Sequence, residues 1–292
     1  MLSLTNGPFA LDFTPEFGGS VRAFTASGVN ILRPSGDMTP NHWDTRESAA
    51  FPMVPFIGRI TNGCFRANDK SVQLPANMPP EPHAIHGFGW QRAWTVLDAS
   101  DTHAVVEHAY NEVDWPWPYR AQQIFKLTEH GLTVTLFVQN QGETPMPTGL
   151  GWHPYFPSHA TTLLAPVTQS WTGLNKLPER TELTSQTDLR FARPVQSLNL
   201  DTAFDCEQAP ISIETDQHTL TLTSDPIFSK LTVYHPKDTD FFCVEPVSHA
   251  PDAINMNLSN EETGLVWLSP GETLQGDISL HVKPHRADVD LA

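Results

Sequence analysis

Two histidines lie among glycine, proline and aromatic residues, where an imidazole can meet a ligand. His86 begins the string HGFGW, and His153 is the histidine of GWHPYFP. Glycines let a backbone approach a ligand closely, and an imidazole can give or take a proton near neutral pH. A lone histidine is more often structural, but the recurrence of such surroundings makes general acid/base chemistry the prediction for both.

A carboxylate lies at the end of an apolar strand pattern. Glu245 closes the string FFCVE and is followed directly by Pro246. Burial at this position would desolvate the carboxylate and raise its pKa toward the range that suits a general base. The alternative interpretation is a strand-end glutamate in contact with water.

Two further polar residues are candidates for binding a ligand rich in hydroxyl groups. Arg59 lies in GRITNG, after an apolar run that contains two prolines, and Asp201 lies in NLDTAF. The planar guanidinium of Arg59 offers a fork of donors to neighbouring hydroxyls, and Asp201 offers acceptors. Arg59 could equally be a surface arginine in a turn, and Asp201 is the least distinctive candidate.

Other chemistries find less support in the sequence. Two histidines and a glutamate can hold zinc, but neither candidate histidine belongs to a His-x-x-x-His pair, and 13 histidines make chance pairs expected. We therefore predict no metal. Glycine-rich phosphate loops, a serine nucleophile elbow and a Cys/His nucleophile arrangement are also missing, which disfavours nucleotide and covalent chemistry.

The composition limits the partners and the setting. The 33 acidic residues outnumber the 17 basic ones, and no basic cluster could follow a phosphate backbone, so we expect neither nucleic acid nor a membrane as a partner. No apolar run approaches the roughly 20 residues that cross a bilayer. The three cysteines are widely spaced and the N-terminus lacks the pattern of a secretory signal, so we expect a cytoplasmic protein.

Apolar residues alternate with polar ones in many short stretches, which predicts β-strands. Long helical patterns are absent, and 26 prolines would break most helices. The clearest predicted strands are Ser20–Ala26, Ala104–Tyr110, Ala121–Thr128, Leu132–Asn140, Ile211–Thr215, Thr219–Thr223, Leu231–Tyr234 and Asp277–Lys283.

The expected architecture is one all-β domain over residues 1–292. No repeat, low-complexity tract or flexible linker divides the chain, although Leu174–Arg193 is polar and poor in strand patterns. So many strands must cover their apolar faces by stacking two sheets. We therefore predict a large, mostly antiparallel β-sandwich with little helix.

The order of the candidate segments resembles that of the aldose 1-epimerase, or galactose mutarotase, family. The shared strings are Gly-Arg-Ile-x-Asn-Gly at Arg59, Ile-His-Gly at His86, Trp-His-Pro-Tyr-Phe at His153 and Glu-Pro-x-x-x-x-Pro-Asp-Ala from Glu245. The resemblance runs through most of the chain. It implies a β-supersandwich with an open cleft on one concave sheet, no metal and no organic cofactor.

The resemblance also implies a role for each candidate residue in interconverting the anomers of an aldose. His153 looks like the general acid, Glu245 the general base, and His86 the residue that holds and polarises the ring oxygen; Arg59 and Asp201 would fix the hydroxyls. Ordinary pKa values of ~4.3 for a carboxyl and ~6.5 for an imidazole already stand in the right order. We therefore expect modest tuning to leave Glu245 ionised and His153 partly protonated near neutrality.

The choice of sugar stays open. The better-known galactose mutarotases have two adjacent glycines after the first histidine, whereas His86 is followed by Gly87, Phe88 and Gly89. The related hexose 6-phosphate mutarotases are an alternative, with Arg92 placed to meet a phosphate, while the acidic composition favours a neutral hexose. A carbohydrate-binding regulator without turnover, a glycoside hydrolase, and a monomer or homodimer are further open alternatives.

Overall fold

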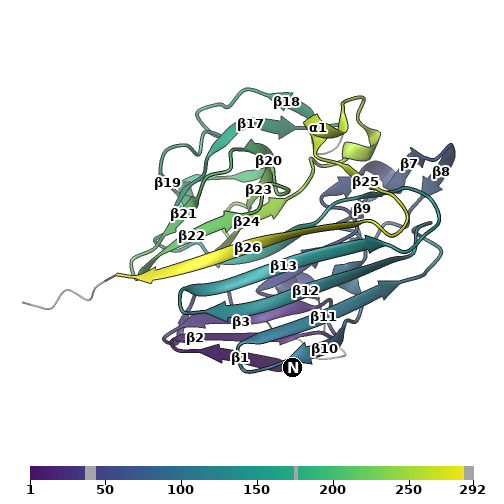
Figure 1. Cartoon of the computed structure of the whole chain (residues 1–292). Coiled ribbons are helices and arrows are strands. Elements are labelled where there is room, and N and C mark those ends of the chain that lie inside the picture. The colour runs from purple at the N-terminus through teal and green to yellow at the C-terminus, as the bar shows by residue number, and fades with distance from the viewer. Residues whose placement is uncertain (37–43, 174–176, 286–292) are drawn as a thin grey trace, which may run out of the picture.

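The computed structural model describes residues 1–36, 44–173 and 177–285. Within them, two large antiparallel sheets of eleven and nine strands pack face to face, as the arrangement of the strands in Figure 1 shows. The apolar residues between the sheets form one continuous core, in which the rings of Phe13 and Phe125, one from each sheet, lie 4.8 Å apart. The predicted all-β sandwich is confirmed.

The strands are arranged as follows. The eleven-stranded sheet contains, in spatial order, β1 (Leu2–Asn6), β2 (Phe9–Thr14), β3 (Ser20–Ala26), β5 (Ala50–Met53), β15 (Gly151–Pro157), β24 (Phe241–Val247), β23 (Lys230–His235), β20 (Leu200–Cys206), β17 (Val167–Thr172) and β18 (Glu179–Thr181), with β4 (Val29–Asn30) paired to β3. The nine-stranded sheet contains β10 (Thr95–Ala99), β11 (His103–Tyr110), β12 (Tyr119–Thr128), β13 (Gly131–Asn140), β26 (Thr273–Pro284), β22 (His218–Ser224), β21 (Ile211–Glu214), β16 (Thr162–Leu164) and β19 (Arg193–Pro194).

Shorter elements lie at the margins of the sandwich. Three two-stranded ribbons pair β6 (Arg59–Ile60) with β9 (Ala84–Ile85), β7 (Cys64–Ala67) with β8 (Lys70–Gln73), and β14 (Met146–Thr148) with β25 (Val266–Leu268). The helices are α1 (Asn260–Thr263) and the 3-10 turns η1 (Thr45–Glu47), η2 (Thr61–Gly63), η3 (Gly89–Gln91), η4 (Val195–Ser197) and η5 (Ala253–Asn255). No helix in the described ranges is long and apolar enough to cross a membrane.

The predicted strands are present, most with ends shifted by one or two residues. The prediction for Ser20–Ala26 coincides with β3, and the alternation at Asp277–Lys283 marks the second half of the longer strand β26. The interval Leu174–Arg193 is indeed poor in strands, since it holds only β18 and the first residue of β19; residues 174–176 lie outside the described part. Helix is minor, as expected.

The register of the eleven-stranded sheet aligns five residues that are far apart in the sequence. Phe51 lies opposite His153, Glu245 lies opposite Thr232, and Thr232 lies opposite Ala203. His153 and Glu245 belong to neighbouring strands, between the registered pairs Gly151↔Val247 and Tyr155↔Cys243. Side chains opposite each other across neighbouring strands point to the same face of a sheet. We call this set of five the central row; it points away from the core.

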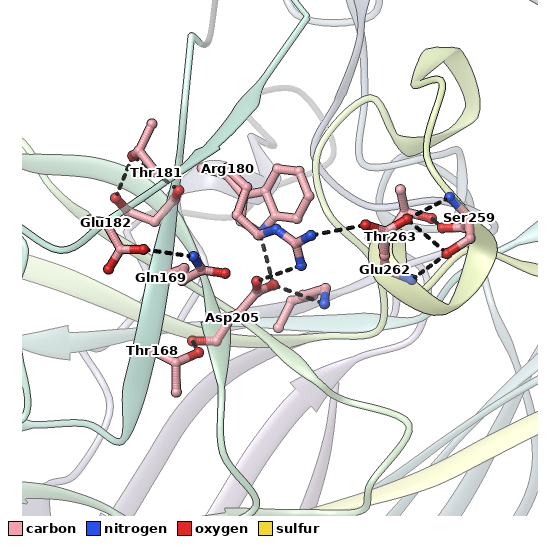
Figure 2. A network of polar contacts seen from close by, with 12 residues as sticks. Thr168, Gln169, Arg180, Thr181, Glu182, Asp205, Ser259, Glu262 and Thr263 are labelled. Carbon is pink, nitrogen blue, oxygen red and sulfur yellow. Dashed lines mark hydrogen bonds and ion pairs between the residues drawn. The ribbon is translucent and has the colours of Figure 1, made fainter.

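A buried polar network follows on the same face, beside the central row. Lys230 Nζ lies 2.9 Å from Asp205 Oδ1, which also accepts a 2.9 Å hydrogen bond from the Trp171 indole. Arg180 lies 3.6 Å from Asp205 and donates to Glu262 of α1 at 3.0 Å, so the network shown in Figure 2 joins α1 to the outer strands of the sheet. Asp205 thus compensates a lysine that is only 7% exposed.

We expect Asp205→Asn to lower the free energy of unfolding by about 3–5 kcal/mol, because it leaves the buried Lys230 ammonium without a counter-charge. The amide keeps an oxygen for the Trp171 indole, so the change isolates the charge. Urea denaturation monitored by tryptophan fluorescence measures the effect. The double variant Asp205→Asn/Lys230→Met should recover most of the loss, and a double variant as unstable as the single one would contradict the assignment.

Candidate functional site

A cavity of about 470 Å³ opens on the face of the eleven-stranded sheet that points away from the core. The five residues that the sequence analysis selects all line it: Arg59, His86, His153, Asp201 and Glu245. They come from strands β6, β15, β20 and β24 and from the turn after β9. The fold therefore brings all five candidates to one hollow, whose volume suits a monosaccharide.

His153 and Glu245 form the centre of the site. His153 Nε2 lies 3.3 Å from Glu245 Oε1, and the two side chains are only 8% and 3% exposed. The imidazole stacks on the ring of Phe51 at 4.4 Å and on the ring of Tyr155 at 4.8 Å. Its orientation is therefore set by packing, and one imidazole nitrogen and one carboxyl oxygen face each other in a nearly dry place.

Burial shifts the pKa values of this pair in opposite directions. Loss of water lowers the pKa of His153 to about 3, an effect to which the nearby charge of Arg33 adds. Burial raises the pKa of Glu245 well above its usual range, and the carboxylate of Asp201 adds to this while Arg59 opposes it. The expectation of modest tuning is thus wrong, because a dry site disfavours charge on either group. Both shifts favour the uncharged form, a carboxylic acid beside a neutral imidazole.

His86 presents a hydrogen-bond donor to the cavity. Its Nδ1 accepts a 3.2 Å hydrogen bond from the backbone N–H of Gly58. Burial first, then the charges of His153 and Arg59, hold the pKa of His86 well below its usual value. A neutral imidazole whose Nδ1 accepts must carry its proton on Nε2. The His86 and His153 ring centres are 5.4 Å apart and the rings are nearly perpendicular.

The turn that carries His86 requires a glycine at position 87. His86 has a φ of 58° and Gly87 a φ of 70°, both in the left-handed region. A Cβ on Gly87 would lie 2.1 Å from the carbonyl oxygen of Val54, so no other residue fits there without moving the chain. This tight turn directs the His86 ring into the cavity.

Arg59 and Asp201 form an ion pair at another part of the cavity wall. Arg59 Nη2 lies 3.3 Å from Asp201 Oδ2, and the side chains are 25% and 33% exposed. The pair retains accessible donors and acceptors, so it can exchange hydrogen bonds with ligand hydroxyls. Two side chains fix the backbone of the segment that carries Arg59. His249 Nε2 accepts a hydrogen bond from the N–H of Ile57, and Asp252 accepts one from the N–H of Thr61.

Several residues of the site were not selected from the sequence. Arg33, Arg46, Trp90, Tyr234 and Phe241 all line the cavity. Tyr234 could have been inferred, because it lies in a predicted strand two residues from Thr232 and so faces the same side. Arg33 and Arg46 lie in a polar stretch without a motif. They reach the cavity only through the fold.

Arg92, considered above for binding a phosphate, lies elsewhere. Its guanidinium makes two hydrogen bonds with the Glu112 carboxylate, at 2.9 and 2.7 Å. It does not belong to the cavity lining. The idea that Arg92 meets a substrate phosphate is therefore wrong, and its role is that of a surface ion pair.

Three potential metal ligands meet at the floor of the cavity. The ligand atoms of His153, Cys243 and Glu245 lie within 4.8 Å of one another. Burial raises the pKa of the Cys243 thiol well above its usual value, as it does for Glu245. A metal ion would have to displace the protons of the carboxyl group and the thiol in order to bind here.

Comparison with known proteins finds a family model and relatives that match along almost the whole chain. The model of the family described as aldose 1-epimerase matches residues 1–281. The uncharacterized Escherichia coli K12 protein YphB is 31% identical over 306 residues, which cover 96% of this chain and 98% of YphB. A solved structure of a proposed aldose 1-epimerase from the same organism is 29% identical and has a TM-score of 0.87, covering 97% and 98% of the two chains. A galactose mutarotase-like protein from Clostridium acetobutylicum, 21% identical, shares the fold with a TM-score of 0.87 over 97% and 95% of the chains.

The protonation states of the two imidazoles can be measured directly. We expect ¹⁵N NMR spectra to show His153 neutral at pH 5, where an ordinary imidazole of pKa ~6.5 is almost fully charged. His86 should be neutral as well and carry its proton on Nε2. The variants His153→Asn and His86→Asn assign the signals. A His153 imidazolium at pH 5 would contradict the assignment of a neutral imidazole beside Glu245.

Proposed function

The chain belongs to the aldose 1-epimerase family, and we propose that it interconverts the α and β anomers of an aldose by opening and reclosing the sugar ring. One observation carries the proposal: a buried imidazole and a buried carboxyl group face each other at 3.3 Å in a cavity of monosaccharide size. A hemiacetal opens when its anomeric hydroxyl loses a proton and its ring oxygen gains one. His153 and Glu245 are suited to these two transfers.

In the proposed reaction Glu245 is the base and His153 the acid. Glu245 takes the proton of the anomeric hydroxyl as the carbonyl forms, and the His153 imidazolium gives a proton to the ring oxygen as the C–O bond breaks. Rotation about the bond between the first two carbons presents the other face of the aldehyde. Reversal of both transfers then closes the ring as the other anomer and restores both groups.

The proton count of the pair agrees with this sequence. The reactive form, a carboxylate beside an imidazolium, holds one proton, as does the neutral pair that burial favours. The two forms differ by one transfer across the 3.3 Å contact, so no proton from bulk water is needed. After ring opening the pair is again neutral. Burial therefore favours the protonation state that accompanies the open-chain sugar.

The other residues position the sugar in this scheme. His86 offers its Nε2–H to the ring oxygen and so polarises the bond that breaks, while Arg59 and Asp201 hold the hydroxyls. The overall charge of −16 favours a neutral hexose, whereas the arginines of the cavity favour an anionic sugar. A carbohydrate-binding protein without turnover is the alternative, and retention of the acid, the base and the polarising histidine speaks against it.

We expect Glu245→Gln and His153→Asn each to lower turnover by about two to four orders of magnitude, the usual contribution of a positioned acid or base. NMR exchange or polarimetry on a panel of aldoses measures anomer interconversion. His130→Asn, on the exposed turn between β12 and β13, is the matched control and should keep the wild-type rate. A wild-type rate no higher than that of buffer would favour a binding protein, and monosaccharide released from a glycoside would favour a hydrolase.

The pH profile tests the shared proton. The pair gains a second proton only when His153 is protonated, at a pKa of about 3, and loses its one proton at the raised pKa of Glu245. We therefore expect kcat/KM, after subtraction of the buffer rate, to stay level from pH 5 up to the raised pKa of Glu245. An unshifted pair would instead lose activity tenfold per pH unit above ~6.5, and such a fall would contradict the scheme.

A further inference from the structure

Arginine and carboxyl side chains are equal in number in the cavity lining, where the carboxyl residues are Glu81, Asp201 and Glu245, although the chain as a whole is strongly acidic. The protein has 17 basic residues other than histidine and a net charge of −16, yet three arginines line this one cavity: Arg33, Arg46 and Arg59. Arg59 is paired with Asp201, and Arg46 with Asp44. Arg33 has no carboxylate within ion-pair distance among the described residues. An arginine without a counter-charge in a partly closed cavity suits an anionic ligand.

Arg33 is held in a fixed position. One of its terminal nitrogens, Nη2, donates to the backbone carbonyls of Arg46 and Ser48, at 2.8 Å each. Its guanidinium carbon lies 4.0 Å from the centre of the Tyr155 ring and 4.6 Å from that of Phe241. The contacts with these two rings thus hold the guanidinium group in place. Nη1 and Nε have no hydrogen-bond partner within the described ranges, and they remain for a ligand.

The sheet places Arg33 and Arg59 at opposite ends of the cavity. Tyr155, Cys243, Tyr234 and Asp201 are registered partners on four neighbouring strands, on the same face as the central row. Neighbouring strands are about 4.8 Å apart, so this line of residues spans roughly 14 Å. Arg33 stacks at the Tyr155 end, and Arg59 pairs at the Asp201 end. A sugar ring that reaches His153 and Glu245 lies between two guanidinium groups.

We infer that the substrate is an aldose that carries an oxyanion on carbon 6, and that Arg33 binds this group with help from Arg46. The orientation rests on the proposed function. If Glu245 holds the anomeric oxygen and His153 the ring oxygen, the ring continues beyond His153 to carbon 5 and its exocyclic carbon 6. Tyr155 stacks on His153, and Arg33 lies over Tyr155. A phosphate or a carboxylate on carbon 6 would therefore meet the free edge of the Arg33 guanidinium.

Binding of 1,5-anhydroglucitol and its 6-phosphate tests the inference without turnover, because neither compound has an anomeric hydroxyl. By calorimetry we expect the wild-type protein to bind the 6-phosphate about ten- to a hundredfold more tightly, as charge-assisted hydrogen bonds would give. Arg33→Met, which replaces the aliphatic part of the side chain but removes the guanidinium group, should reduce this preference to less than about threefold. The matched control Arg120→Met removes a guanidinium 5.6 Å from the centre of the Phe137 ring, outside the cavity lining, and should keep the preference.

The inference is wrong if the wild-type protein binds the two compounds equally tightly, or if Arg33→Met still prefers the 6-phosphate. It is also wrong if Arg33→Met weakens the binding of both compounds equally, because Arg33 would then be purely structural. The wild-type comparison decides even if the variant does not fold. Anomer exchange of glucose, glucose 6-phosphate and glucuronate then separates the two proposals. Preferential binding of the 6-phosphate without anomer exchange would refute the mutarotase activity but support the anion site. Exchange of all three sugars at equal rates would support the activity and refute the anion site. Faster exchange of the phosphate or of the carboxylate identifies the oxyanion.

Discussion

The contact between His153 and Glu245 is the constraint on which the site depends. Two titratable groups are kept at 3.3 Å with almost no access to water. A charge on either group therefore has a high free-energy cost unless the other group carries the opposite charge. The rings of Phe51 and Tyr155 pack against the imidazole and leave it little freedom to turn. The acid/base character of the site is therefore a property of the pair, and the surrounding hydrophobic packing maintains it.

The pairing of strands in the sheet fixes the distance between His153 and Glu245. Because the two residues belong to adjacent strands, their separation follows from strand spacing and register, which many backbone hydrogen bonds determine. A slip of one residue in either strand would turn its side chain to the core face. The network around Asp205 supports the same sheet farther out, where a buried lysine needs a counter-charge on the neighbouring strand.

Much of this structure could be predicted from the sequence, and the limits have physical reasons. Alternation located strands such as β3, and the recurrence of glycine and aromatic residues selected His86 and His153. Burial of Glu245 was foreseen as a cause of a raised pKa, but its extent and the depressed pKa of His153 depend on neighbours distant in the sequence, such as Phe51 and Arg33. Arg33 itself had no local signal, because its position arises only when the strands pair.

The hydrogen bond from Gly58 to His86 joins two parts of the site that the chain keeps 28 residues apart. Gly58 immediately precedes Arg59, so the backbone that carries the guanidinium also fixes which nitrogen of His86 bears hydrogen. Any displacement of this segment would move the Arg59 guanidinium and change the orientation of a neutral donor together. In the proposed reaction, a sugar that fails to engage Arg59 would therefore also meet a less ordered imidazole, so selection at Arg59 would affect the bond that is to break.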